Sequence, residues 1–185
     1  MQIVWLFGSP CIGKTTLVAP LAERSSWGFI QADCLRKEVW SQLRCRSSSR
    51  SATRSLSLDQ AILESMRDSR LYTALYRTLG ATLIPYAYNI AQGSSAPMTV
   101  IECPVSLLPA QTLPGLRILA NIGVELHQRL LSARLRISKE EAHDLASFLL
   151  HVSQRCEYQR PPHRSLPIEN LPELLLSLAG QKCEN

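Results

Sequence analysis

The first sixteen residues constrain this chain more than any other part of it. An apolar run from Ile3 to Phe7 is followed by the sequence GSPCIGKT at residues 8–15, and a helical pattern follows directly. This is the pattern G-x-x-x-x-G-K-[ST] in a strand–loop–helix context, which is typical of a phosphate-binding loop. Backbone N–H groups of such a loop surround the phosphates, Lys14 reaches the outer phosphates and the Thr15 hydroxyl binds Mg²⁺. The motif therefore predicts binding of a nucleoside triphosphate with Mg²⁺.

The positive end of the following helix adds to the attraction for the same phosphates. We expect the nucleotide to be held by the residues of this loop, which are Gly8, Ser9, Pro10, Cys11, Ile12, Gly13, Lys14, Thr15 and Thr16.

Strand and helix patterns alternate along the chain, which predicts an α/β fold with a mostly parallel sheet. We expect strands at 2–7, 27–31, 98–102, 116–120 and, as a weak edge strand, 166–168. We expect helices at 14–24, 34–43, about 59–91 with Pro85 as a candidate break, 121–135 capped by Asn121, 139–154 and from Asn170 to Gly180. Residues 103–115, which hold three prolines, are predicted as loop. The predicted architecture is the three-layer fold of P-loop NTPases, with five strands and helices on both faces.

Length and composition indicate one domain over residues 1–185, with a full-sized core. Residues 44–57 are basic and rich in Ser and Arg, so they are predicted to be a mobile loop or lid. No apolar run approaches the ~18 residues of a membrane span, and the start does not resemble a signal peptide. We therefore expect a cytoplasmic protein with no membrane partner; the oligomeric state is not predicted.

Charge and cysteine content restrict the possible functions less than the phosphate-loop motif does. The net charge of +5 comes from 16 Arg and 4 Lys, which suits a phosphate-rich active site and a nucleic-acid substrate equally. The six cysteines form no C-x-x-C pair, so we expect reduced thiols rather than disulfides or zinc ligands.

Asp33 is the candidate general base. It follows the second expected strand, and ligands of open α/β sheets lie beyond the carboxyl ends of the strands. A carboxylate there can accept the proton of a substrate hydroxyl that attacks the γ-phosphate. The alternative is a helix-capping role. Arg36, three residues later, favours the functional interpretation and is a candidate substrate-binding residue.

Arg129 and Arg134 are candidates for stabilising the charge that develops on the transferred phosphoryl group. Their spacing of five does not place them on one helical face, so they can meet only if Arg134 lies where the helix gives way to a lid. Glu102 ends the third expected strand, where it can serve either Mg²⁺ or the substrate.

These residues together resemble a group of small P-loop kinases related to polynucleotide 5′-kinase, zeta toxin and chloramphenicol phosphotransferase. The similarity lies in the phosphate loop at 8–16, in an s-x-D-x-x-R step at 31–36, in a strand with an acidic end at 100–102, and in a lid step at 129–134. The lid step is one residue longer than the R-L-x-x-R of that group. The resemblance implies that Asp33 is the substrate-side base and that Arg129 and Arg134 clamp the phosphates of ATP.

Two departures from this group concern the acceptor site. The group has a helix after the third strand, where this chain has a proline-rich segment, and residues 44–57 are an insertion. Both segments flank the expected acceptor site, so the acceptor is not implied by the resemblance.

Three functions follow from these residues. The first is an ATP- and Mg²⁺-dependent kinase with catalytic residues Lys14, Asp33, Arg129 and Arg134, acting on a hydroxyl of a small or nucleoside-like molecule. The second is a polynucleotide 5′-hydroxyl kinase that uses residues 44–57; the aromatic content of 6% argues against it, because single-strand binders use stacking platforms. The third is a nucleotide-binding module without efficient phosphoryl transfer. The chain has no D-x-x-G or N-K-x-D sequence of the kind found in GTPases.

Overall fold

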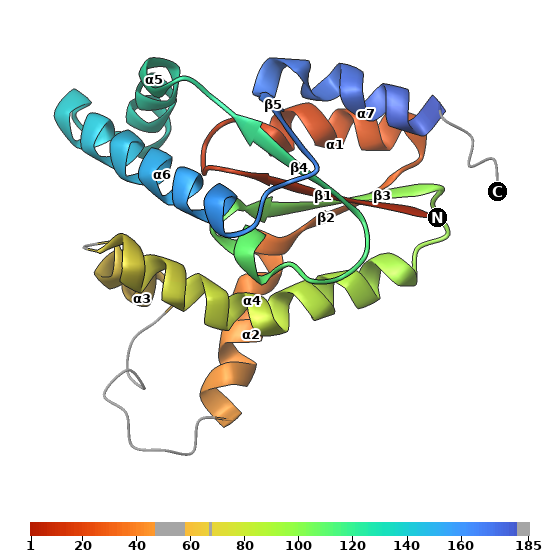
Figure 1. Cartoon of the computed structure of the whole chain (residues 1–185), viewed down its shortest axis with the longest axis horizontal. Coiled ribbons are helices and arrows are strands. Elements are labelled where there is room, and N and C mark those ends of the chain that lie inside the picture. The colour runs from red at the N-terminus through yellow and green to blue at the C-terminus, as the bar shows by residue number, and fades with distance from the viewer. Residues whose placement is uncertain (47–57, 67, 181–185) are drawn as a thin grey trace.

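The computed structural model describes residues 1–46, 58–66 and 68–180, with the side chains of 42–46, 59 and 63 left out (Figure 1). Its centre is a five-stranded sheet in the order β2-β3-β1-β4-β5, in which every pair of neighbours is parallel. The strands are β1 (Gln2–Gly8), β2 (Gly28–Gln31), β3 (Met98–Pro104), β4 (Leu116–Asn121) and β5 (Arg164–Pro167). The predicted parallel sheet and its edge strand are confirmed.

Helices cover both faces of this sheet, which makes the three layers that the sequence predicts (Figure 1). The helices are α1 (Lys14–Ser25), α2 (Ala32–Arg46), α3 (Leu58–Ser65), α4 (Ser69–Gln92), α5 (Val124–Leu135), α6 (Lys139–Gln159) and α7 (Leu171–Gly180), with short 3₁₀ helices η2 (Val105–Ala110) and η3 (Ile168–Asn170). Helices α1 and α7 lie on one face, while α2, α4, α6 and η2 lie on the other.

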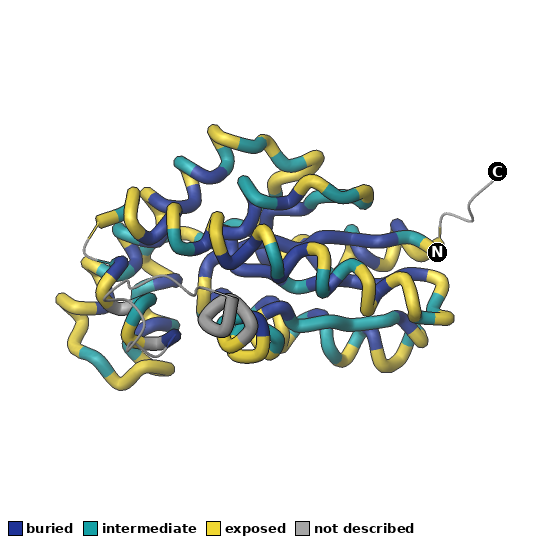
Figure 2. Tube along the Cα trace, turned by 90° about the horizontal axis from the view of Figure 1, so that it is seen from below, coloured by how far each residue is buried: buried dark blue, intermediate teal, exposed yellow. Residues whose placement is uncertain are grey.

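The alternation of side chains along β1 builds two separate cores. Trp5 and Phe7 pack on the α4 and α6 side, whereas Val4 and Leu6 pack on the α1 and α7 side. Because both faces are covered, the strand is a continuous apolar run rather than an alternating one. Figure 2 shows the result as buried strands between helices whose outer sides are exposed.

The register of the strands brings the candidate site residues to one edge of the sheet. Gly8, at the end of β1, pairs with Pro104 of β3 and Ala120 of β4. Glu102 lies between Leu6 of β1 and Gln31 of β2. The phosphate loop, the acidic end of β3 and the start of α2 therefore meet at the carboxyl edge.

The break in the long predicted helix lies elsewhere than expected. Helix α3 ends at Ser65 and α4 begins at Ser69, where the Asp68 side chain accepts from the Arg70 N–H group. Pro85 lies inside the continuous 24-residue α4, so the prediction of a break there was wrong. A proline removes one hydrogen bond of the helix. Ile84 is buried beside it, and its packing offsets that loss.

The predicted loop at 103–115 was also partly wrong. Strand β3 continues to Pro104, and η2 follows with Val105, Leu107 and Leu108 buried against the core. The prolines are compatible with this short 3₁₀ helix because it makes few repeating hydrogen bonds.

Helix boundaries near the site differ in smaller ways. Gly123, not Asn121, precedes α5, because Asn121 ends β4 and its Nδ2 donates to the Ser165 hydroxyl. The predicted capping box of Ser138 and Glu141 at the start of α6 is confirmed.

Of the predicted mobile segment at 44–57, residues 44–46 belong to α2 and the remainder lies outside the described residues. None of the described helices is long and apolar enough to cross a bilayer.

Candidate active site

The phosphate loop joins β1 to α1 and closes around its own lysine. Lys14 Nζ donates to the carbonyl oxygens of Gly8 at 3.0 Å and Ser9 at 2.9 Å. The side chain is only 6% exposed, and burial lowers the pKa of its ammonium while Glu102 opposes that shift. The ammonium is therefore a buried cation at the inner wall of the loop.

The backbone of the loop takes a shape suited to anions. Gly13 has φ of +91° and Cys11 has φ of +62°, and such left-handed residues are typical of loops whose N–H groups face an anion. A Cβ atom on Gly8 would lie 2.7 Å from Ile12 Cδ1 and 3.0 Å from the Ala120 carbonyl oxygen, so a side chain here would displace its neighbours in the loop and in β4. No described side chain caps α1, which leaves its first N–H groups available to a phosphate.

Glu102 connects the loop to β3. Its Oε2 accepts a 2.7 Å hydrogen bond from the Thr15 hydroxyl, and its Oε1 lies 3.8 Å from Lys14 Nζ. A carboxylate and a hydroxyl at this separation are the oxygen ligands that Mg²⁺ prefers. The two side chains fit a shared role in holding Mg²⁺ or its water shell.

Asp33 lies in the first turn of α2 and faces the same loop. Its Oδ1 is 3.2 Å from Arg36 Nε in an ion pair whose N–H is not aimed at the carboxylate. The Arg36 guanidinium also donates to the Tyr76 hydroxyl at 3.0 Å. The Asp33 side chain is 56% exposed, so a ligand can reach it.

The Arg36 contact continues into a buried polar network between α4 and η2. The Tyr76 hydroxyl is hydrogen-bonded to Tyr72, which is hydrogen-bonded to Ser106 of η2. Burial raises the pKa of both tyrosines, so both remain neutral donors and acceptors near neutral pH. The network holds Arg36, and through it Asp33, against the interior of the protein.

These groups share one cavity of about 200 Å³. It is lined by the loop residues 10–16 together with Asp33, Glu102 and Arg134. Arg134 reaches it from the last turn of α5. The structure thus brings Asp33, Glu102 and Arg134 together with the predicted nucleotide-binding residues 10–16 of the loop, which include Lys14 and Thr15.

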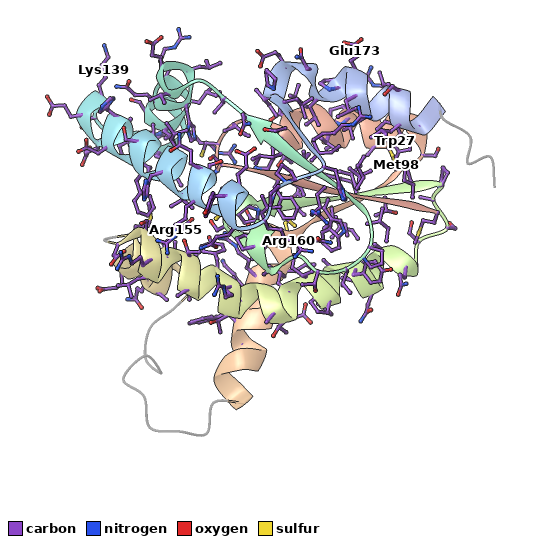
Figure 3. All side chains as sticks on the ribbon, viewed as in Figure 1. Trp27, Met98, Lys139, Arg155, Arg160 and Glu173 are labelled. Atoms are coloured by element: carbon purple, nitrogen blue, oxygen red, sulfur yellow. The ribbon has the colours of Figure 1, made fainter. Side chains whose placement is uncertain are left out.

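Arg129 lies elsewhere. It lines a separate hollow of about 680 Å³ together with Gln128 of α5 and Lys139 of α6, the latter labelled in Figure 3. Five residues along a helix turn the side chain by roughly 140°, so Arg129 and Arg134 point in different directions. The arrangement does not bring Arg129 to the phosphate loop.

His127 supports the phosphate loop, a role that was not predicted from the sequence. This residue of α5 is 3% exposed, and its Nε2 lies 2.9 Å from the Pro10 carbonyl oxygen. Burial lowers the pKa of the imidazole, so the neutral ring donates through Nε2 to the loop. The sequence pattern that could have identified it is its i, i+4 spacing from Leu131, which is also buried, because this spacing places both residues on the same face of α5. The same spacing relates the missed Tyr72 and Tyr76 of α4.

Comparisons with known proteins agree with this geometry at the level of the fold. No protein-family model matches the chain. No curated protein matches it in sequence. Among solved structures, the protein TT1252 from Thermus thermophilus is similar over 98% of both chains, with 17% identity and a TM-score of 0.66. A shikimate kinase from Bacteroides thetaiotaomicron matches 97% of this chain and 98% of its own, with 15% identity and a TM-score of 0.58.

A dephospho-CoA kinase from Campylobacter jejuni also matches 97% of this chain and 98% of its own, with 14% identity and a TM-score of 0.50. At these identities the likeness concerns the fold, and it confirms the predicted three-layer P-loop architecture. Neither of these two kinases is named as a member of the polynucleotide kinase and zeta toxin group, so that finer resemblance stays a prediction.

Proposed function

We propose that this protein is an ATP- and Mg²⁺-dependent kinase that transfers the γ-phosphate to a hydroxyl group of a small or nucleoside-like molecule. The observation that carries the proposal is one cavity that combines a phosphate-binding loop with an exposed carboxylate, Asp33, and a guanidinium, Arg134. Two solved structures of the same fold are named as kinases of small molecules, which supports this class of reaction.

Each side chain has a role that follows from its position. The loop N–H groups and Lys14 bind the β- and γ-phosphates, while Thr15 and Glu102 hold Mg²⁺, which offsets the negative charge of these phosphates. Arg134 faces the same cavity and stabilises the charge that spreads over the transferred group. Arg129 remains a proposed second clamp, although it must move toward the cavity to serve as one.

Asp33 acts on the acceptor side. As the acceptor oxygen bonds to the γ-phosphorus, its proton passes to the Asp33 carboxylate, and the bond from that phosphorus to the bridging oxygen of ADP breaks. Arg36 holds the carboxylate from behind through the contact at 3.2 Å. The exposed position of Asp33 leaves its other oxygen free to meet a hydroxyl.

The experiment is a measurement of ADP release with Mg²⁺ and ATP over a panel of acceptors. The panel contains nucleosides, sugars, hydroxylated antibiotics and an oligonucleotide with a 5′-hydroxyl end. The inactive control is Lys14→Ala, and the matched control is Lys37→Ala, an exposed lysine on α2. Acceptor-dependent ADP release that is lost only in Lys14→Ala supports the proposal and identifies the acceptor class.

ATP binding without stimulation by any acceptor contradicts efficient transfer to these classes and favours a nucleotide-binding module. Stimulation by the oligonucleotide alone would replace the small-molecule acceptor with a nucleic-acid end.

A further inference from the structure

Helix α5 contacts the phosphate loop at two points. His127 Nε2 lies 2.9 Å from the Pro10 carbonyl oxygen, and the Cys11 side chain packs against an apolar cluster that α5 and α6 share. The buried members of this cluster are Leu131 of α5 and Ala142, Ala146 and Leu149 of α6. Helices α5 and α6 themselves pack side by side (Figure 1). The loop is therefore held against the pair of helices.

The contact with His127 fixes the peptide group between Pro10 and Cys11. A carbonyl oxygen can only accept a hydrogen bond, so His127 Nε2 donates. No peptide bond of the described chain is cis, and in a trans peptide the C=O and N–H groups point in opposite directions. Because the Pro10 carbonyl points toward His127 on α5, the Cys11 N–H group points away from that helix.

The Cys11 N–H group is available to a ligand of the candidate active site. It donates to no backbone acceptor within the described part of the chain. Pro10 and Cys11 both line the cavity that Lys14 and Arg134 also line. The left-handed backbone of Cys11, with φ of +62°, is typical of loops whose N–H groups face an anion.

The face of α5 that meets the loop also carries Arg134. Seven residues of an α-helix make almost two full turns, so His127 and Arg134 differ in direction by only about 20° and lie about 10 Å apart along the axis. Arg129, two residues after His127, points about 160° away from it, which agrees with its position in the separate hollow. The position of α5 against Pro10 therefore determines where Arg134 enters the cavity.

We propose that His127 is a positioning residue that acts on the nucleotide site in two ways. It directs the Cys11 N–H group toward a phosphate of the nucleotide, and it holds α5 against the loop so that Arg134 reaches the phosphates. His127 acts through these two groups and needs no contact with the nucleotide. The inference rests on the proposed function, because it takes Mg²⁺·ATP to be the ligand of the cavity, and it adds the connection between the loop and Arg134.

The competing role for His127 is packing alone. Its side chain is buried on α5, and an apolar side chain of similar size would fill that space as well. In that role nucleotide binding does not depend on the Nε2–H group. His127→Leu fills the space but leaves the Pro10 carbonyl without its donor, whereas His127→Gln keeps a nitrogen donor at the same number of bonds from Cα.

The first measurement is an NMR titration with Mg²⁺·ATP that follows the Cys11 N–H signal. The matched control is His151→Leu, which removes an exposed histidine of α6. We expect the signal to move to higher frequency at saturation in the wild type, in His151→Leu and in His127→Gln, because the N–H then donates to a phosphate oxygen. In His127→Leu we expect no such move and an affinity for Mg²⁺·ATP about five-fold weaker.

The second measurement tests the effect on Arg134 by isothermal titration calorimetry. It compares the dissociation constants of Mg²⁺·ATP for the wild type, His127→Leu, Arg134→Gln and the double variant. We expect Arg134→Gln to weaken binding about ten-fold in the wild type but less than about two-fold in His127→Leu, where Arg134 is already displaced.

The outcomes separate this inference from the proposed function. Binding by the wild type with an unmoved Cys11 signal overturns the inference, whether or not the variants fold. Equal affinities of His127→Leu and the wild type, or equal losses in His127→Leu and His127→Gln, overturn it in favour of packing alone. Equal losses from Arg134→Gln in both backgrounds overturn the effect on Arg134. No binding of Mg²⁺·ATP by the wild type contradicts the proposed function itself, and this inference with it.

Discussion

Replacing Glu102 with glutamine removes the nearest carboxylate from a buried lysine. Lys14 Nζ and Glu102 Oε1 are 3.8 Å apart, which corresponds to about 4 kcal/mol at an effective dielectric constant of ~20 and about 1 kcal/mol at ~80. Both side chains are largely shielded, with 6% and 13% exposed, and Lys14 keeps its two carbonyl partners. We expect the interaction to contribute about 2 kcal/mol to the free energy of unfolding.

The contribution of the Lys14–Glu102 interaction to the free energy of unfolding depends on pH. Burial holds the pKa of Lys14 below its unfolded value, so the charged lysine opposes folding and stability rises as pH increases through the folded pKa. Without Glu102 the pKa of folded Lys14 falls further, so the free energy of unfolding begins to rise at a lower pH. The difference in stability between wild type and Glu102→Gln is therefore largest at pH values where folded Lys14 is charged in the wild type, and it shrinks at high pH, where folded Lys14 is uncharged in both proteins.

The assay is a double-mutant cycle measured by urea unfolding without nucleotide or Mg²⁺. It combines the wild type, Glu102→Gln, Lys14→Met and the double variant, near neutral pH and near pH ~10. A coupling energy of about 2 kcal/mol at neutral pH that diminishes at the higher pH agrees with the structure. A coupling below about 0.5 kcal/mol, or one that does not change with pH, would refute the electrostatic reasoning.

The other predictions concern catalysis and the support of the base. Asp33→Asn should lower kcat by about 10²- to 10⁴-fold with little change in the dissociation constant of ATP, and unchanged turnover in steady-state assays would exclude the role as base. Arg134→Gln should lower kcat by about 10³-fold, more than Arg129→Gln does; equal losses would mean that Arg129 moves into the cavity. Tyr76→Phe leaves Arg36 without its hydroxyl partner, so urea unfolding should show a loss of about 1–3 kcal/mol; a smaller loss would indicate that water replaces the hydroxyl.

The parts of the site that the sequence predicts are those carried by local patterns. The phosphate loop is contiguous, and its neighbouring strand and helix are visible as apolar periodicity, so Lys14 and Thr15 could be assigned directly. The parallel sheet then places Asp33 and Glu102 at the same edge, because the carboxyl ends of β1, β2 and β3 lie together.

The remaining features depend on packing between distant segments. Nothing in the sequence shows that Tyr76 meets Arg36 across 40 residues or that His127 meets Pro10 across 117. The direction of Arg129 depends on how α5 packs against α6, which the helical spacing alone does not determine. Pro85 misled the prediction because the buried neighbours of a proline can sustain a helix that local preference would interrupt.

The most direct test of the central claim is the binding of Mg²⁺·ATP measured by isothermal titration calorimetry. The variants are Lys14→Ala, which removes the buried ammonium of the loop, and Lys37→Ala, which removes an exposed lysine of α2. We predict one saturable site in the wild type, the same affinity in Lys37→Ala and an affinity at least about ten-fold weaker in Lys14→Ala. No binding by the wild type, or equal binding by Lys14→Ala, would contradict the assignment of this cavity as a nucleotide site.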